Sequence, residues 1–465
     1  MADARRGWRT ALVPAVLALA ATPAPAQTII LPPPSGAPQA IDFSRDPLLV
    51  FGHASSLPGP FLEQLGDAVA RHPAVAAAIA EQEAQSGVRT QVRARLFPRI
   101  DAQFVAARAL ARDFGDRSTI VESLSPRART DVVVAGDQLL FDFGATGARI
   151  AAANTRIRAA HADIERAAAE TALRAVGAWY DRLQDQMLVD ITAAAARRQQ
   201  AVLADVRARM TQGVGSAGDV ARTEAVVADT EALAARLAGR LAQSRARYRE
   251  AFGVEPPPRL ARAMAPASVA TRADIAEAMG RDTPAVQVAR LVAEAVRRDH
   301  AAARADGLPR LSAALNGSRY NIFSGNDYEI RGTLVVRQSL FAGGAQRGRI
   351  AEVAADARKA GFEADRVAAE AARDAAIAFA EVEALQATAA VLEAAYVANR
   401  RARDSYVEQY RVARGTLIEL LRAEQAYATA AVNYVEGVVA LDVARYTLLV
   451  RTGEMLPAAG VTIGG

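Results

Sequence analysis

The chain has 465 residues, of which 51% are hydrophobic but only 5% aromatic, and its formal net charge is +5. It contains no cysteine, which excludes disulfides, thiolate metal sites, a cysteine nucleophile and the acylated cysteine of a lipoprotein. Alanine dominates the apolar content and favours long, closely packed helices, while the arginines alternate with Asp and Glu, so the positive charge does not predict nucleic-acid binding.

The first 26 residues are predicted to form a secretory signal peptide. A basic start at residues 5–9 and an apolar run at 11–21 precede the small-residue cleavage site Ala24-Pro25-Ala26. The mature chain is therefore expected to begin at Gln27 outside the cytoplasm, with residues 27–60 proline-rich and extended. No later run of about 18 apolar residues is evident, so no membrane-spanning helix is expected. A membrane crossing would then require a closed β-barrel.

The rest of the chain is built mainly from two similar copies. His72-Pro73 recurs as Thr283-Pro284, 211 positions later, and Leu140-Phe141 recurs as Leu340-Phe341, 200 positions later. From Phe141 to Gly253 the first copy aligns with the second without an insertion or deletion. This is expected of helices that must keep a packing register. The predicted divisions are copies at 61–253 and 271–453, a Pro-containing linker at 254–270 and a tail at 454–465.

Each copy is predicted to contain a helix, a β-hairpin, a very long helix and a half-length helix, in that order. The opening helices span about 63–95 and 274–304, and the strands span 99–104, 131–141, 311–323 and 329–341. The long helices span 145–211 and 345–410, roughly 100 Å each at about 1.5 Å per residue, and the half-length helices span 219–251 and 417–450. A packed seam is predicted along the first long helix at Val176, Tyr180, Leu183, Met187 and Ile191.

The strands alternate apolar and polar residues. In the last strand, Leu334 and Val336 share one face while Thr333 and Arg337 share the other, and Ser324-Gly325-Asn326-Asp327 is typical of a hairpin turn. Four strands cannot close a barrel, and open sheet edges are not tolerated in lipid. Three chains would pool twelve strands, within the range of outer-membrane barrels. The expected fold is thus an α+β membrane protein, a trimeric 12-stranded β-barrel continued by a long α-helical tube.

The motifs at the element boundaries resemble those of the TolC-like outer-membrane efflux proteins, of the unacylated type. The resemblance rests on Leu96-Phe97-Pro98-Arg99-Ile100, on Leu139-Leu140-Phe141-Asp142-Phe143-Gly144 and on the run from Tyr410 to Ala423. It implies a homotrimer in the outer membrane of a Gram-negative bacterium, with a coiled-coil tunnel in the periplasm and contact with outer-membrane lipid. It further implies a periplasmic adaptor and an inner-membrane ABC or proton-driven transporter as partners, so that the chain is a passive exit duct for type I secretion or small-molecule efflux, not an enzyme.

The resemblance also implies a gate at the periplasmic tip. Asp219 and Tyr410 match two gate-linking positions, and Glu419 matches a ring of acidic residues. Three carboxylates around an axis attract cations and repel anions. A solvated helix surface is the alternative for each charge, and Asp219 could also be a helix N-cap, because it follows Gly218 at a helix start.

Two arginines near this tip depart from the family pattern. Arg422 stands where the family has a further acid, and Arg414 lies beside Gly415, which replaces the gate arginine of the family. Both are retained as candidate constriction residues.

A soluble coiled-coil adaptor of the periplasm is the alternative interpretation, because adaptors also contain long helical hairpins. Two equivalent copies, each with an amphipathic hairpin, favour the duct. The glycine pattern at 213–218 does not follow a strand, so it does not predict a nucleotide site, and the four histidines show no ligand spacing. No cofactor or metal is expected.

Overall fold

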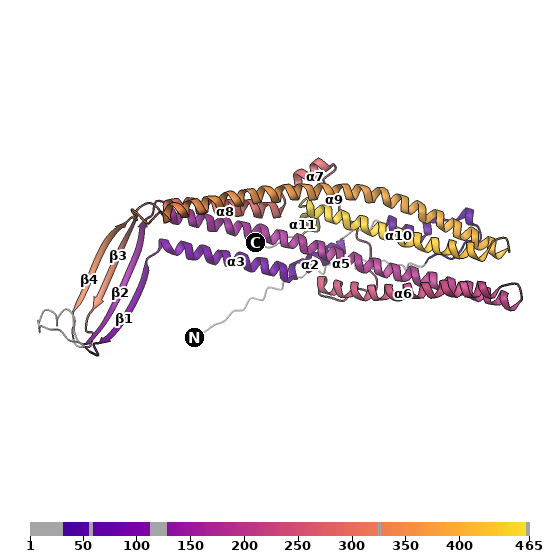
Figure 1. Cartoon of the computed structure of the whole chain (residues 1–465), viewed down its shortest axis with the longest axis horizontal. Coiled ribbons are helices and arrows are strands. Elements are labelled where there is room, and N and C mark those ends of the chain that lie inside the picture. The colour runs from indigo at the N-terminus through magenta and orange to yellow at the C-terminus, as the bar shows by residue number, and fades with distance from the viewer. Residues whose placement is uncertain (1–30, 55–58, 112–127, 324, 326, 462–465) are drawn as a thin grey trace, which may run out of the picture.

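The computed structural model describes residues 31–54, 59–111, 128–323, 325 and 327–461. In this part of the chain a four-stranded sheet forms one end of an elongated molecule, and long helices extend from it to the other end (Figure 1). The expected signal peptide, Gln27 and two of the predicted turn residues, Ser324 and Asn326, lie outside the described residues.

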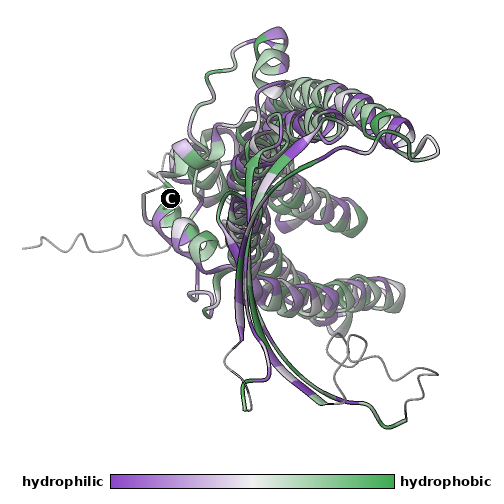
Figure 2. Cartoon of the chain, turned by 90° about the vertical axis from the view of Figure 1, so that its left-hand side faces the viewer, coloured by the Kyte–Doolittle hydropathy of each residue, from purple (hydrophilic) through white to green (hydrophobic). Residues whose placement is uncertain are grey.

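The sheet is antiparallel, and its spatial order follows the chain: β1 (Arg99–Arg108), β2 (Ala128–Phe141), β3 (Arg310–Arg319) and β4 (Tyr328–Arg337). Its strands bend together into an arc when the sheet is viewed from its own end of the molecule (Figure 2). The pairing is regular except for a bulge in β2 near Leu139. β1 is longer than predicted, while β3 and β4 end earlier, so Leu340 and Phe341 fall outside β4.

The two long helices, α5 (Ala145–Thr211) and α9 (Ala345–Arg411), each contain 67 residues. This length confirms the predicted helices and corresponds to about 100 Å. Each helix follows a left-handed glycine, Gly144 with φ 87° and Gly344 with φ 88°. Residues with side chains rarely adopt this conformation, which explains why glycine recurs at these two equivalent positions.

The half-length helices return along the long ones. α6 (Ala217–Phe252) packs on α5, and α10 (Leu417–Arg451) packs on both α9 and α5. The α5–α6 and α9–α10 turns lie together at the end of the molecule far from the sheet, which we call the tip (Figure 1). The tip therefore combines elements from both copies.

The opening helix of each copy is broken, although a single helix is predicted there. The first copy has α2 (Gly59–Arg71) and α3 (Pro73–Arg93), and the second has α7 (Ala273–Gly280) and α8 (Pro284–Ala305). Each later helix begins with proline, which lacks the N–H needed to continue the preceding helix and favours the first helical position. α3 packs on α5, and α8 packs on α5 and α9.

The prediction of an extended segment at residues 27–60 is wrong for much of its described part. The segment contains two short 3₁₀ turns, η1 (Pro38–Ala40) and η2 (Phe43–Arg45), and the helix α1 (Pro47–His53). The Asp46 carboxylate accepts hydrogen bonds from the first turn of α1, and proline follows it. Such a cap with proline at the first position starts a helix.

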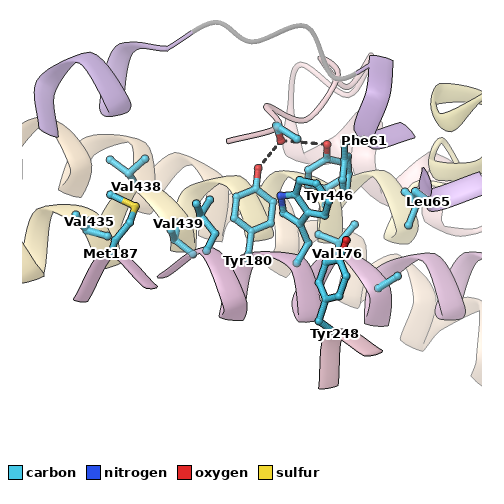
Figure 3. Packing of buried hydrophobic residues seen from close by; sticks show 14 of the residues in the cluster. Phe61, Leu65, Val176, Tyr180, Met187, Tyr248, Val435, Val438, Val439 and Tyr446 are labelled. Atoms are coloured by element: carbon cyan, nitrogen blue, oxygen red, sulfur yellow. Dashed lines mark hydrogen bonds between the residues drawn. The ribbon is translucent and has the colours of Figure 1, made fainter. Parts of the chain in front are cut away.

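The largest core cluster lies midway along the helices, where α2, α5, α6 and α10 meet (Figure 3). All five residues of the predicted seam on α5 are buried. The hydroxyls of Tyr180 and Tyr446 both donate to the carbonyl of Ala263, which belongs to the predicted linker (Figure 3). The core therefore joins helices of the two copies through the linker.

A buried ion pair also binds the linker to α10. Arg262 donates to Asp442 of α10 at 2.6 and 2.9 Å, and its side chain is 5% exposed. The same guanidinium donates to the carbonyl of Gly52 at the end of α1, at 2.5 Å. The linker is thus a packed part of the molecule. A final short helix, α11 (Met455–Ala459), also packs against this region.

Among the described helices, α9 contains an 18-residue window apolar enough to cross a membrane by composition, with a mean hydropathy of 1.5 and 11% of the window buried. No such stretch is expected from the sequence, because glutamates interrupt the apolar run; alanines together with larger apolar residues such as Ile377 and Val391 nevertheless raise the mean. Length and composition are weak grounds for a span, since α9 is far longer than a bilayer and packs on α7, α8 and α10.

Candidate functional site

One face of the sheet is apolar across all four strands. The register aligns alternate residues of neighbouring strands, such as Ala313 with Leu334 and Leu311 with Val336. The larger members of this face are Ile100, Phe104, Val132, Val134, Leu311, Leu315, Ile330, Leu334 and Val336. Leu334 is 73% and Val336 71% exposed. An exposed apolar face of this extent is suited to contact with lipid.

The other face of the sheet carries most of the polar and charged residues, with a few apolar ones such as Val133 and Val335 among them. The register gives this face Arg99, Asp101, Gln103, Asp131, Asp137, Arg310, Asn316, Glu329, Arg331, Thr333 and Arg337. Some charges pair along their own strand, as Arg99 does with Asp101 at 3.0 Å. A strand with one apolar and one polar face, repeated across a sheet, is typical of an outer-membrane barrel with an aqueous interior.

Exposed aromatic residues border the apolar face. Where the sheet meets the helices, Phe97, Phe141 and Phe341 are 58%, 54% and 89% exposed. At the opposite end of the sheet, Phe323 and Tyr328 are 80% and 76% exposed. Aromatic side chains at both limits of an apolar band match the girdles that position a barrel between the two surfaces of a membrane.

At the tip, Tyr410 lies where the two helical hairpins meet. Its ring is 4.4 Å from the guanidinium of Arg209, in the last turn of α5. Its partners in a small apolar cluster include Val206 and Leu421. Burial raises the pKa of Tyr410, Arg209 opposes this, and the nearby carboxylate of Asp219 also raises it. Tyr410 therefore contacts Arg209 across the two hairpins, and the described structure shows no hydrogen bond between Tyr410 and Asp219.

Asp219 is the third residue of α6, and the interpretation of Asp219 as the N-cap is wrong. The N-cap is Ser216, whose hydroxyl accepts from the backbone N–H of Asp219 at 3.1 Å and donates to its carboxylate at 2.8 Å. A carboxylate in the first turn also interacts favourably with the positive end of the helix dipole. Asp219 therefore has a local stabilising role besides its position beside Tyr410.

Glu419 occupies the equivalent position in α10 and forms a capping box with Thr416. Its Oε2 accepts from the backbone N–H of Thr416 at 2.9 Å and from the hydroxyl at 2.8 Å, while the hydroxyl accepts from the backbone N–H of Glu419. These donors hold the pKa of Glu419 below its usual value. The sequence matches a capping box, but this role was not predicted for Glu419.

The two candidate arginines lie apart from this arrangement. Arg414 is in the α9–α10 turn, and Arg422 lies exposed on α10 beside a second groove that includes Asn399. Within the described residues, neither arginine makes an ion pair or side-chain hydrogen bond with Asp219 or Tyr410. All five predicted site residues therefore lie in or near the two turns of the tip, and their assignment to a gate stays a prediction.

Sequence reasoning missed Arg209, which covers the Tyr410 ring and pairs with Asp205 at 2.9 Å. It also missed the ion pair of Arg207 with Glu224, at 2.6 Å, which joins α5 to α6 near the tip. The Asp205–Arg209 spacing of four residues in a predicted helix was a usable signal. The stacking of Arg209 on Tyr410 had no such sequence signal, because it joins residues from different copies.

A groove of about 520 Å³ opens between α5 and the α9–α10 hairpin, next to the tip. Its wall on α5 includes Ala194, Arg198, Ala201, Asp205 and Arg209. These residues recur every three or four positions, as one face of a helix does. The groove is thus a long surface with both apolar and charged groups, shaped by helices of both copies.

Comparison with known proteins agrees with this architecture. Residues 65–254 match the model of the outer membrane efflux protein family. No curated protein matches the sequence. The Campylobacter jejuni CmeC outer membrane channel has a TM-score of 0.76 at 11% identity, over 90% of this chain and 92% of that one.

Two further outer-membrane proteins have similar structures. VceC of Vibrio cholerae has a TM-score of 0.72 at 18% identity, over 86% of this chain and 96% of that one. The open state of the Neisseria gonorrhoeae MtrE outer membrane channel has a TM-score of 0.73 at 16% identity, over 86% and 90% respectively. At these identities the likeness establishes a shared fold.

Proposed function

We propose that this chain, a member of the outer membrane efflux protein family, is the exit duct of a tripartite export system. It is a protein of the outer membrane whose helices extend into the periplasm. The observation that carries the proposal is the two-faced sheet joined to helices about 100 Å long. Such a molecule can line a water-filled path from one side of the outer membrane deep into the periplasm.

Trimer formation follows from the edges of the sheet. The sheet order leaves β1 and β4 as edges, and unpaired backbone groups cost several kcal/mol each in lipid. Pairing β4 of one chain with β1 of the next in a homotrimer would satisfy them in a 12-stranded barrel. Outer-membrane lipid would cover the apolar face, and solutes would pass along the polar face.

The groove beside the tip supports an adaptor as the periplasmic partner. It offers a helix face of small and charged residues on α5, which suits a helical hairpin packed alongside. The adaptor would connect the duct to an inner-membrane ABC or proton-driven transporter. That transporter would select the cargo, whether a secreted protein or a small molecule. The alternative of a soluble adaptor lacks support, because an adaptor has no need for the exposed apolar sheet face.

The tip is the proposed gate. Tyr410 of α9 contacts Arg209 of α5, and Asp219 lies in the first turn of α6, so polar groups of both hairpins are available at the tip to hold it closed. Glu419 would contribute a ring of carboxylates around the trimer axis, with Arg414 and Arg422 nearby in the constriction. A channel closed by a few polar contacts opens when those contacts are weakened.

Planar-bilayer recording of the purified protein tests this function. Wild type should form ion-conducting channels, and Asp219→Ala combined with Tyr410→Phe should raise the single-channel conductance. Asp229→Ala, on the exposed surface of the same helix, is the matched control and should leave conductance unchanged. Absence of any channel activity would refute the duct. A double variant that conducts like wild type would refute the assigned gate residues alone.

A further inference from the structure

The described N-terminal segment lies along α9 and runs antiparallel to it, from the tip at Leu31 toward the middle of the molecule at Asp46. At its far end, the Asp46 carboxylate accepts from the guanidinium of Arg400. One helical turn nearer the tip, the backbone N–H of Ser35 donates to the Asp404 carboxylate at 3.2 Å. Between them, the ring of Phe43 lies 5.2 Å from the guanidinium of Arg400. Residues 31–46, which we call the strap, therefore follow α9 over several turns.

The strap covers an arginine that is completely buried. The side chain of Arg403 is 0% exposed and lies 2.5 Å from the Asp404 carboxylate. It donates to the carbonyl of Pro32 at 3.2 Å and lies 4.3 Å from the centre of the Tyr427 ring. A buried charge is costly unless it is paired, so the strap backbone contributes to keeping Arg403 inside.

The strap also reaches the other hairpin. Leu31 is 4% exposed, and Leu31 and Pro33 line the groove beside the tip together with Arg198 of α5 and Tyr410 of α9. Arg198 in turn donates to Glu424 of α10 at 2.5 Å. The strap thus bridges α5 to the α9–α10 hairpin, and these are the elements whose turns form the tip.

The strap contributes one carboxylate to a buried ionic cluster that it covers. Three arginines and three carboxylates form the cluster: Arg198, Arg400, Arg403, Asp46, Asp404 and Glu424. Of these, only Asp46 belongs to the strap. Nε of Arg403 contacts the Asp404 carboxylate, and its Nη1 lies 3.9 Å from Glu424. Removing one partner from a buried ionic network is destabilising, because the remaining charge is left without compensation.

We propose that the strap holds the last turns of α9 against α5 and so keeps the tip closed, and that the tip opens when the strap shifts. The inference rests on the proposed function of the tip as a gate. Physically, residues 404–411 form a continuous helix from the strap contacts to Tyr410. A displacement of α9 at the strap is therefore transmitted to the gate.

Loosening the strap tests the proposal in planar bilayers. Asp46→Asn removes the strap carboxylate and should make openings several-fold more frequent than in wild type. Phe43→Leu, which keeps an apolar side chain but removes the aromatic face, should act in the same direction if Asp46→Asn fails to fold. Arg45→Gln is the matched control, because the Arg45 side chain is 91% exposed and its ion pair among the described residues is with Asp42 of the strap itself, at 3.8 Å. Openings as rare as in Arg45→Gln would overturn the proposal.

Tethering the strap gives the opposite test. The chain has no cysteine, so a pair introduced by Gly36→Cys and Glu408→Cys is the sole target of a short bis-maleimide. A Cβ at Gly36 would lie 3.9 Å from the Glu408 carboxylate. Cross-linked protein should remain in the low-conductance state even with Asp219→Ala, whereas the untreated protein should open. Equal conductance before and after cross-linking would overturn the proposal.

Hydrogen exchange separates failure of the strap from failure of the duct. If wild type conducts no ions, the proposed function fails, and the strap is judged by the exchange rate of residues 404–411 in detergent. Asp46→Asn should accelerate this exchange relative to Arg45→Gln if the strap holds α9. Equal exchange in the two variants would show that the strap does not restrain the helix.

Discussion

At the residue scale, the capping box gives Glu419 a structural role that can be separated from its proposed role in the channel. Glutamine can accept the same bonds from Thr416, because Glu and Gln both serve at this position of a capping box. Glu419→Gln therefore removes the charge and retains the cap. Thr416→Ala removes the cap and retains the charge, at a cost of about 0.5–2 kcal/mol in helix stability.

If three copies of Glu419 surround the axis, Glu419→Gln should weaken cation selectivity, measured as the reversal potential across a salt gradient, and weaken block by multivalent cations from the periplasmic side. Thr416→Ala should leave selectivity near wild type. Because Thr416 lowers the pKa of Glu419, the carboxylate stays ionised at neutral pH. In a ring of three, repulsion between the carboxylates opposes this effect and raises their apparent pKa values, so selectivity should be lost as the pH falls through the range in which the carboxylates become protonated. Unchanged selectivity in Glu419→Gln would remove this residue from the constriction.

Residue patterns alone reached only part of this site. Asp219 and Tyr410 were selected through the family resemblance; the structure places them in the first turn of α6 and the last turn of α9, and their pairing stays a prediction. The partner of Tyr410, Arg209, and the buried pair of Arg262 with Asp442 could not be found in this way. Each joins segments far apart in the chain, and their contact depends on how the helices pack, which a local pattern does not specify.

At the element scale, the elements with the strongest hydrophobic periodicity were predicted most accurately. The 67-residue helices and the seam on α5 follow from a repeated three- and four-residue spacing. The breaks before Pro73 and Pro284 were missed, because the helical pattern on both sides looked continuous although proline favours a helix start. The helix α1 was missed because three consecutive prolines earlier in the segment favour extended backbone, whereas the cap at Asp46 starts a helix only locally.

The sheet leads to a prediction about its membrane face. Leu334→Arg or Val336→Arg would place a charge on the apolar face and should destabilise the inserted protein by about 2–4 kcal/mol near mid-depth. Thr333→Arg lies on the polar face and should be tolerated. Insertion into liposomes, followed by urea titration of the inserted protein, measures the difference. Equal insertion and stability of the three variants would mean that the face assignment is reversed or absent.

At the scale of the whole molecule, a single copy leaves large apolar surfaces uncovered. On α9, Phe362, Ile377 and Val391 are 73%, 57% and 68% exposed. They follow one another at intervals of 14 or 15 residues, close to four helical turns, so they share one face of the helix. Lipid cannot cover this face along most of a helix in the periplasm. A neighbouring copy can, and the unpaired edges of the sheet require the same neighbour.

The native unit is therefore expected to be a trimer in mild detergent, and native mass spectrometry should detect three copies. Ile377→Asp places a charge in the exposed apolar face of α9 and should lower the trimeric fraction, because the charge would have to lose its water at the interface without a partner. Glu383→Gln, at an exposed position on a different side of the helix, should leave the trimer intact. A stable wild-type monomer would contradict a barrel built from the strands of three chains. A trimer that is unaffected by Ile377→Asp would still agree with the barrel. Pairing between β4 and β1 would then hold the copies together without this face of α9.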